Sequence, residues 1–383
     1  MRIESVPSLE DVDPNAWNRL NRDHYPFLRH EFLVALERHG CVGEAVGWVP
    51  CHLLCYRDDE LVGAAPLYIK YHYLGEFIFD HAWEAAYRRV GLPYYPKLVG
   101  AIPFTPATGQ RLLAAPDDDR STIAAALAAA AKAVARQLDA SSVHWLFPVE
   151  EDQRLLCGQG YLQRLGCQFH WTNRGYGDFE DFLGVLSSKK RKNIKRERRT
   201  VAEAGLSLEV FGGTELDAPL WQVFHDFYVT TFEKRWGYPT MTLGFFREIG
   251  RTMGEQLVLP LARDPKGQPV AGAICYRSDT TLYGRHWGCL AEYNHLHFET
   301  CYYQGIDYCI RHGLTHFEPG AQGEHKISRG FLPTLTHSAH WLAHPEFHRA
   351  VADFLDREGP AVRDYAKQLF ASSPYRAEEV PTL

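Results

Sequence analysis

Residues able to transfer protons or bind anions crowd one segment of the sequence, from Tyr283 to Phe331. The ionisable side chains that we single out there are His286, His295, His297, Glu299, His312, His316, Glu318, Glu324, His325, Lys326 and Arg329. Histidines and carboxylates serve as general acids and bases, and cations beside glycine-rich backbone suit anions. A segment that only stabilised a fold would rarely need this mixture, so we interpret it as the wall of a site.

The segment reads as a strand, a loop, a helix, a second strand and a second loop. The helix begins near His297 and stops at Gly313, a residue type favoured just beyond helix ends. Glu299 lies in its first turn, where a carboxylate complements the helix dipole. Glu318 ends the second strand, and His325 follows in a loop flanked by glycines.

A similar order of elements occurs earlier in the chain, which predicts two lobes of related design. Residues 51–74 read as two strands joined by a turn at Asp58–Asp59. Residues 257–289 repeat this hairpin with a turn at 265–267, and a helix and a strand follow each hairpin. Ser121 or Thr122 is the expected N-cap of the first of these helices.

We place the boundary between the lobes in the polar stretch that begins at Gly175. The N-terminal lobe then covers residues 1–178 and the C-terminal lobe covers residues 179–383. In the second lobe we expect a basic helix over residues 183–203 and another helix over residues 220–234.

Composition describes an ordinary globular protein. With 383 residues, 45% hydrophobic and 23% charged, the chain is long enough for two domains with ample cores. Its longest apolar stretch, residues 123–131, is far short of the roughly 20 residues that span a membrane. The first residues carry no apolar run of the signal-peptide kind, so we expect a cytoplasmic protein without a membrane span.

Neither cysteines nor histidines show the spacing of a metal site. The nine cysteines include no CxxC pair, which favours reduced thiols. The pairs His295/His297 and His337/His340 occur, but no set has the spacing of structural zinc ligands. No GxSxG motif marks a nucleophilic serine. We therefore predict no metal.

The net charge of −6 is unevenly distributed, because Lys189 to Arg199 holds eight basic residues and one acid. On a helix these cations would cover every face, which favours contact with an anionic ligand over a merely solvated stripe. Phosphates of a tRNA, a nucleotide carrier or coenzyme A would suit Lys190, Arg191 and Arg196. A charged helix without a ligand is the alternative.

Several long blocks resemble one known family. They are GEFIFDHAWEAAY, YYPKL, PFTPATGQRLL, GRHWG, LHFETCYYQGIDY and FEPGAQGEHKISRGFLP. Together they resemble the FemAB-like predicted N-acyltransferases, over about residues 17–358. The resemblance implies an α/β (α+β) fold of two tandem GCN5-related acetyltransferase-like lobes, with mixed central sheets flanked by helices.

The resemblance also implies direct transfer of an acyl group from a carrier to an amine, in the cleft between the lobes and without a tightly bound cofactor. The frequency of acyl-CoA among GCN5-like lobes slightly favours that donor. The usual Q/R-x-x-G-x-G/A loop is absent, since the corresponding positions read LAEYNHLHFE. This absence and the basic run favour the alternative, an aminoacyl-tRNA-dependent, Fem-type peptide-bond-forming ligase.

The resemblance implies an amine-bearing small molecule or peptide as the acceptor. An alternative of another class is a non-catalytic protein that binds a peptide or nucleotide.

Amine acylation requires a base, because a primary amine with a pKa near 10.4 is mostly protonated at neutral pH. Glu318 and His325 are the leading candidates, with Glu299 at the helix start as a third. The alternative for each is a structural role in a salt bridge, a loop anchor or the helix dipole.

The resemblance assigns further residues to binding. Lys326 or Arg329 matches a cation that precedes a Gly-Phe pair in Fem-type ligases and helps hold the donor. The residues expected to bind substrate are Asp80, His81, Trp83, Lys97, Thr105, Arg285, His286, His297 and Glu324. For the segment 103–109, which contains Thr105, a rigid packing loop between the lobes is the alternative.

Overall fold

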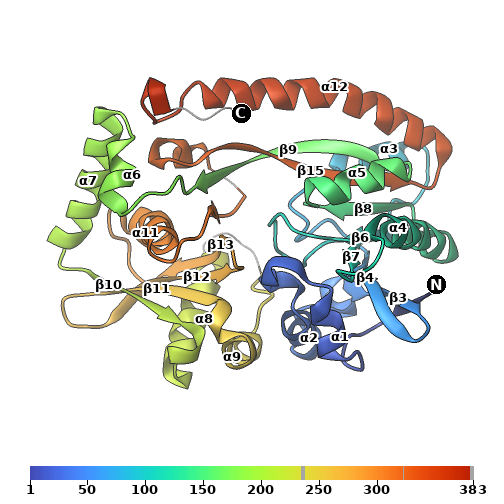
Figure 1. Ribbon diagram of the computed structural model, residues 1–383, viewed down its shortest axis with the longest axis horizontal. Coiled ribbons are helices and arrows are strands. Elements are labelled where there is room, and N and C mark those ends of the chain that lie inside the picture. The colour runs from blue at the N-terminus through green and yellow to red at the C-terminus, as the bar shows by residue number, and fades with distance from the viewer. Residues whose placement is uncertain (234–237, 322, 380–383) are drawn as a thin grey trace. The chain divides into compact units, whose positions relative to one another are not determined.

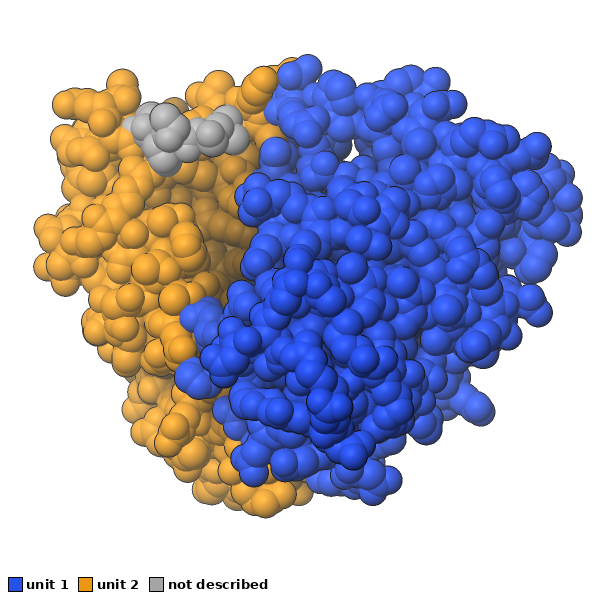
Figure 2. Space-filling model, turned by 45° about the vertical axis from the view of Figure 1, so that its right-hand side comes forward, with its two compact units in different colours: residues 1–167, 335–365 blue, residues 168–334, 366–383 orange. Residues whose placement is uncertain are grey.

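The chain folds into two compact units, which the computed structural model shows in Figures 1 and 2. The structure describes residues 1–233, 238–321 and 323–379. Unit 1 comprises residues 1–167 and 335–365, and unit 2 comprises residues 168–334 and 366–383. The predicted boundary after residue 178 therefore falls inside unit 2. The difference arises because strands β9 (Leu162–Thr172) and β15 (Leu332–Leu342) each begin in one unit and end in the other.

Unit 1 contains two sheets. One has the strand order β1-β3-β4-β7 and is antiparallel, and the other has the order β15-β8-β6-β5-β2 with β6 and β8 parallel. Its remaining strands are β1 (Arg2–Val6), β2 (Trp48–Pro50), β3 (His52–Arg57), β4 (Glu60–Ala65), β5 (Tyr68–Lys70), β6 (Lys97–Gly100), β7 (Leu113–Ala114) and β8 (Ser142–Leu146). The predicted turn at Asp58–Asp59 joins β3 to β4, and both residues have the positive φ of a type I′ hairpin.

The core of unit 1 is built around one alanine-rich helix, α4 (Arg120–Gln137). Its fully buried stripe includes Ile123, Leu127 and Ala131, which pack with residues of both sheets. The N-cap is Asp119, whose carboxylate accepts from the Ser121 N–H, so the expected Ser121 or Thr122 cap is wrong. The other helices are α1 (Pro14–Arg19), α2 (His30–Arg38), α3 (His81–Arg89) and α5 (Glu150–Gly158).

Unit 2 holds a mixed sheet of order β10-β11-β12-β13-β14-β9. Strands β13 and β14 are parallel, and the other pairs are antiparallel. The strands are β10 (Ser207–Gly212), β11 (Leu257–Arg263), β12 (Pro269–Arg277), β13 (Thr281–Cys289) and β14 (His316–Glu318). Gly288 allows helix α8 to approach this sheet closely, since a Cβ there would lie 1.6 Å from the Phe227 carbonyl oxygen.

Helices cover both faces of this sheet: α8 (Ala218–Glu233) and α9 (Leu243–Thr252) lie on one face, and α11 (Gln304–Arg311) lies on the other (Figure 1). Further helical segments include α6 (Phe179–Gly184), α7 (Ser188–Glu203), α10 (Leu296–Phe298), the π-helix η6 (Glu299–Tyr303), the 3-10 helix η7 (Glu324–Arg329) and α12 (Pro345–Phe370). No helix within the described residue ranges combines the length and the apolarity that crossing a membrane requires.

The helix expected over residues 183–203 is interrupted. It divides into the end of α6 and the whole of α7, because the intervening chain bonds elsewhere: Leu186 forms a β-bridge with Tyr375, and the Ser187 N–H donates to the Pro374 carbonyl. The helix expected over residues 220–234 corresponds to α8, and its last residue, Lys234, lies outside the described residues.

Candidate active site

A cavity opens in unit 2 where two parallel strands part. Tyr283 of β13 is in register with Glu318 of β14. Strand β14 ends at Glu318, whereas β13 continues to Cys289. The residues of β13 that follow Tyr283 therefore no longer have β14 beside them. The resulting cavity has a volume of about 470 Å³. Its lining is Thr231, Ala273, Cys275, Gly284, Arg285, His286, Trp287, His297, Cys301, Tyr302, Pro319, Gly320, Ala321, Gly323, His325 and Lys326.

A β-bulge shapes the strand side of the cavity. In the pairing of β12 with β13, Ile274 lies opposite His286, but the next residue of β12, Cys275, lies opposite Gly284. The register therefore skips Arg285 of β13, which is the extra residue of the bulge. Such bulges redirect side chains and often lie next to active sites. His286 packs edge-on against aromatic rings of α8 and α9, and burial lowers its pKa well below the usual value. This imidazole is therefore neutral at neutral pH.

A π-helical turn shapes the opposite side. The helical residues from Leu296 to Arg311 contain η6, in which the hydrogen-bond ladder widens by one residue. His297 precedes this turn, and Cys301 and Tyr302 lie within it, with all three side chains facing the cavity. The His297 ring meets the Tyr302 ring edge-on at 5.3 Å.

His325 is the residue of this cavity best suited to accept a proton. Its Nε2 atom and the Tyr302 hydroxyl share a hydrogen bond 2.9 Å long. Burial and the nearby charges of Arg329 and Lys326 lower the pKa of His325, so the ring is neutral at neutral pH. The residue is nevertheless exposed enough to meet a substrate.

Lys326 supplies a buried cation beside this base. The side chain is 2% exposed, and its Nζ donates to the Gly320 carbonyl at 2.6 Å. Burial lowers the pKa of Lys326 to about 8, although the neighbouring Cys301 acts in the opposite direction. Lys326 thus carries a positive charge at neutral pH but can lose it in mildly alkaline solution.

The family of the chain follows from comparison with known proteins. Residues 8–377 match the FemAB-like family, described as peptidoglycan biosynthesis/recognition. The chain belongs to the FemAB-like family. No curated protein matches the chain.

Solved structures share its fold at low sequence identity. FemX has a TM-score of 0.54 at 12% identity, with 92% of this chain and 100% of FemX covered. The C-terminal domain of a putative lysylphosphatidylglycerol synthetase from Agrobacterium fabrum has a TM-score of 0.53 at 8% identity, with 90% and 94% covered. The L-PGS structure from Bacillus licheniformis has a TM-score of 0.50 at 11% identity, with 79% and 89% covered.

These findings confirm the predicted family and the predicted α/β fold of two GCN5-related acetyltransferase-like lobes. This FemAB-like chain is accordingly an acyltransferase, in the broad sense that includes aminoacyl transfer.

Two residues predicted to act in the FemAB-like site form ion pairs with the basic helix α7, one part-buried and one buried. Glu299 accepts two hydrogen bonds from Arg198, both 3.1 Å long, and a third from Gln304 at 2.8 Å. Arg329 donates to both carboxylate oxygens of Glu197, at 2.8 and 3.2 Å. Neither Glu299 nor Arg329 lines the cavity.

The other predicted carboxylates lie near the cavity but outside its lining. The half-buried Glu318 has a carboxylate oxygen 4.0 Å from Nε2 of His170. Burial lowers the pKa of His170 to about 3, so this contact joins a carboxylate to a neutral ring. Glu324 is exposed at the start of η7.

The predicted phosphate-binding residues Lys190, Arg191 and Arg196 lie on α7, where they are exposed or half-buried. Farther along α7, Arg198 and Arg199 border a second hollow of about 350 Å³, which Glu299 also lines. The basic run is thus on a helix, as predicted, and two of its members, Glu197 and Arg198, connect it to the elements around the cavity.

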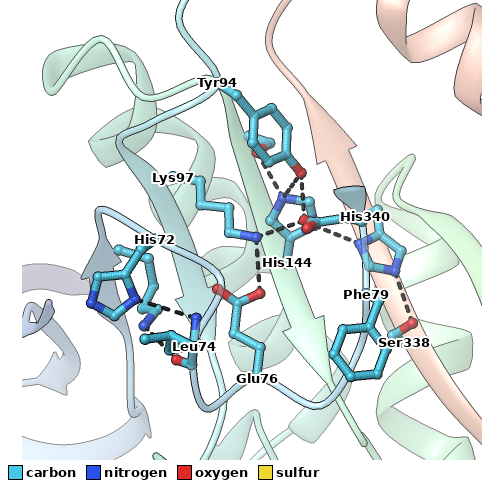
Figure 3. A network of polar contacts seen from close by, with 12 residues as sticks. His72, Leu74, Glu76, Phe79, Tyr94, Lys97, His144, Ser338 and His340 are labelled. Atoms are coloured by element: carbon cyan, nitrogen blue, oxygen red, sulfur yellow. Dashed lines mark hydrogen bonds and ion pairs between the residues drawn. The ribbon is translucent and has the colours of Figure 1, made fainter. Parts of the chain in front are cut away.

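The residues predicted to bind substrate in the first lobe lie in unit 1, and all but one of them are buried. Asp80 and Lys97 are 3% and 0% exposed and join a buried polar network (Figure 3). Trp83 is buried, and Thr105 is buried with its hydroxyl donating to the Pro103 carbonyl. His81 alone among these residues is exposed, stacked on Phe79.

Tyr302 and Cys301 were not among the residues predicted from sequence. A helical spacing of four residues relates His297 to Cys301, which could have been noticed. Tyr302 follows His297 by five residues, and only the π-turn brings two residues at that spacing to the same face of the helix. The sequence carries no clear signal for this turn. Within the described residues, no group of three histidine, cysteine or acidic side chains is arranged to hold a metal ion.

Proposed function

We propose that this FemAB-like protein transfers an aminoacyl or acyl group to an amine, and that the reaction takes place in the cavity of unit 2. The observation that carries the proposal is the pairing of an accessible neutral base, His325, with the buried cation Lys326 on one turn of η7. The Tyr302 hydroxyl orients the base.

In the proposed reaction, the acceptor amine attacks the carbonyl carbon of the donor. The negative charge that develops on the carbonyl oxygen is stabilised by the ammonium group of Lys326. His325 takes the proton that the amine loses and returns it to the departing oxygen or sulfur of the carrier. An amide bond forms as the carrier ester or thioester bond breaks. No enzyme-bound acyl intermediate is needed, and burial raises the pKa of Cys301 well above its usual value, which keeps that thiol unreactive.

We propose a polyanionic donor, with aminoacyl-tRNA favoured over the acyl-CoA of our sequence-based expectation. Helix α7 has 16 residues, and its eight cations, from Lys189 to Arg199, extend over about 15 Å at 1.5 Å per residue. Such a length suits the repeated phosphates of a nucleic acid better than the few phosphates of coenzyme A. The ion pairs of Arg198 and Glu197 tie this helix to η6 and η7, which supply Tyr302, His325 and Lys326.

The test is binding and transfer with charged tRNA and with acetyl-CoA, using the whole chain. The variant Lys190→Glu/Arg191→Glu/Arg196→Glu should weaken tRNA binding at least tenfold and flatten its dependence on salt. Arg247→Glu/Arg251→Glu changes two exposed cations of α9 and serves as the matched control.

If the protein transfers the acetyl group from acetyl-CoA at a rate that the α7 substitutions do not change, the donor is acyl-CoA rather than aminoacyl-tRNA. If neither donor supports transfer and His325→Gln leaves ligand binding unchanged, the enzyme proposal is wrong and a binding protein is indicated.

A further inference from the structure

One segment of unit 1 is apolar where loops are usually polar. Residues 71–79, here called the aromatic loop, connect β5 to α3. Five of its large side chains are exposed: Tyr71 54%, Tyr73 41%, Leu74 53%, Phe77 40% and Phe79 56%. Single exposed apolar residues are normal, but a contiguous set marks an interaction surface.

The acids of this region point inward. Glu76, within the aromatic loop, and Asp80, directly after it, are each 3% exposed. Both carboxylates accept from the buried Nζ of Lys97, at 2.8 and 2.6 Å (Figure 3). The loop therefore has its charges inside and its aromatic rings outside, the reverse of the usual arrangement. Its outer side presents no carboxylate of its own to repel an anionic surface.

Buried donors hold the loop in this conformation. The Leu74 carbonyl accepts from Nζ of Lys70 at 2.9 Å and from Nε1 of Trp48 at 3.0 Å. Phe77 has a φ of 60°, which is rare for a bulky residue and persists only where surrounding contacts enforce it. The exposure of the rings is thus part of a fixed structure.

Cations follow the loop along the chain. Helix α3 begins directly after Asp80 and ends with Arg88 and Arg89, which are exposed; Arg88 also pairs with Glu84 of the same helix at 2.8 Å, and its side chain is 77% exposed. Beyond it, Val90 and Leu92 are also exposed, at 60% and 39%. Exposed tyrosine and phenylalanine rings, followed along the chain by exposed arginines, have the chemistry of the bilayer interface, where rings enter the headgroup region and arginines meet anionic lipid.

We propose that the aromatic loop is a peripheral membrane-docking element, whose exposed rings insert into the interface of a bilayer containing anionic lipid. The attachment is reversible, since a few inserted side chains bind far more weakly than a spanning helix. This inference does not depend on the proposed transfer reaction.

The test is co-sedimentation of the whole chain with phosphatidylcholine vesicles, with and without phosphatidylglycerol. Vesicles containing phosphatidylglycerol should sediment the wild-type protein. Phe77→Asn/Phe79→Asn should reduce this binding at least tenfold, and Asn tolerates the positive φ at position 77. Arg88→Gln/Arg89→Gln should remove the preference for phosphatidylglycerol.

Leu138→Asn/Leu290→Asn removes two exposed apolar side chains outside the loop, 40% and 62% exposed, and should bind as the wild type does. Thermal unfolding of each variant checks that it is folded. Wild-type protein that stays in the supernatant with both vesicle types overturns the proposal. Equal sedimentation of the wild type and Phe77→Asn/Phe79→Asn also overturns it, and would assign the loop to a protein partner.

Discussion

The Tyr302 hydroxyl and Nε2 of His325 lie 2.9 Å apart, although they come from different elements, the π-turn η6 and the 3-10 turn η7. The ring of His325 also lies 6.5 Å from that of His297. In the tautomer that the proposed reaction requires, Nε2–H donates to the Tyr302 oxygen, so this hydrogen bond fixes the orientation of the proposed base and leaves Nδ1 to accept the proton of the substrate. This relationship is the part of the site most open to direct test.

We expect His325→Gln to lower kcat by about 10²–10⁴-fold, the usual contribution of a positioned base. Tyr302→Phe removes only the orienting hydroxyl, and we expect a smaller loss of about tenfold, since an orienting bond contributes about 1–1.5 kcal/mol. Steady-state transfer assays give both values, and urea unfolding checks that stability is kept. A His325→Gln enzyme with wild-type kcat would move the base elsewhere, and Glu318 would be examined next.

The pH dependence of kcat/KM should report both His325 and Lys326, because this ratio reflects the ionisation of the ligand-free protein. The lowered pKa of His325 places its deprotonation below the usual value for histidine, so activity should already be established at neutral pH. The pKa of Lys326 is about 8, so its positive charge, and with it oxyanion stabilisation, should be lost as the pH rises through 8.

Profiles of kcat/KM for the acceptor against pH test this expectation. Lys326→Met should abolish the alkaline decline and lower the plateau. If the activity of Lys326→Met still declines at alkaline pH, the decline belongs to another group.

Gly323 should be required for the placement of His325. Its φ is 114°, and a Cβ at this position would lie 2.3 Å from the His325 ring. We therefore expect Gly323→Ala to lower kcat at least tenfold by displacing the base, at a stability cost of about 1–3 kcal/mol from backbone strain. Gly267→Ala is the matched control, because that glycine also has positive φ, 78°, but meets no atom within 4 Å. It should lose similar stability and keep its activity.

Local signals in the sequence predicted the local parts of the fold. The dipeptide Asp58–Asp59 indicated a turn because acidic residues tolerate positive φ, and it joins β3 to β4. Gly313, with φ of 67°, follows the end of α11 as expected of a helix-terminating glycine. The cap of α4 is Asp119 rather than Ser121 or Thr122, because both of those hydroxyls donate to the Asp119 carboxylate, which caps the helix.

The partners of charged residues are distant in sequence and were not predictable from it. Glu299, predicted to lie at the reaction centre, pairs with Arg198, 101 residues away. Arg329, predicted to hold the donor, pairs with Glu197, 132 residues away. Periodicity and motif spacing describe one element at a time, so they indicate that a carboxylate or a cation is present without indicating which neighbour it meets.

The Arg329–Glu197 pair should contribute strongly to the stability of unit 2. The side chains of Arg329 and Glu197 are only 8% and 10% exposed, and the Tyr303 hydroxyl also donates to Glu197. Arg329→Met would leave a buried carboxylate without its cation, for which we expect a loss of about 3–5 kcal/mol in the free energy of unfolding. Urea unfolding provides the measurement, and the double variant Arg329→Met/Glu197→Met should recover part of the loss because it leaves no buried charge unpaired.

Lys195→Met is the control from the same helix: its partner Glu180 is 67% exposed, so the change should cost less than about 1 kcal/mol. Equal losses for Arg329→Met and Lys195→Met would show that α7 is not held to η7 by this ion pair.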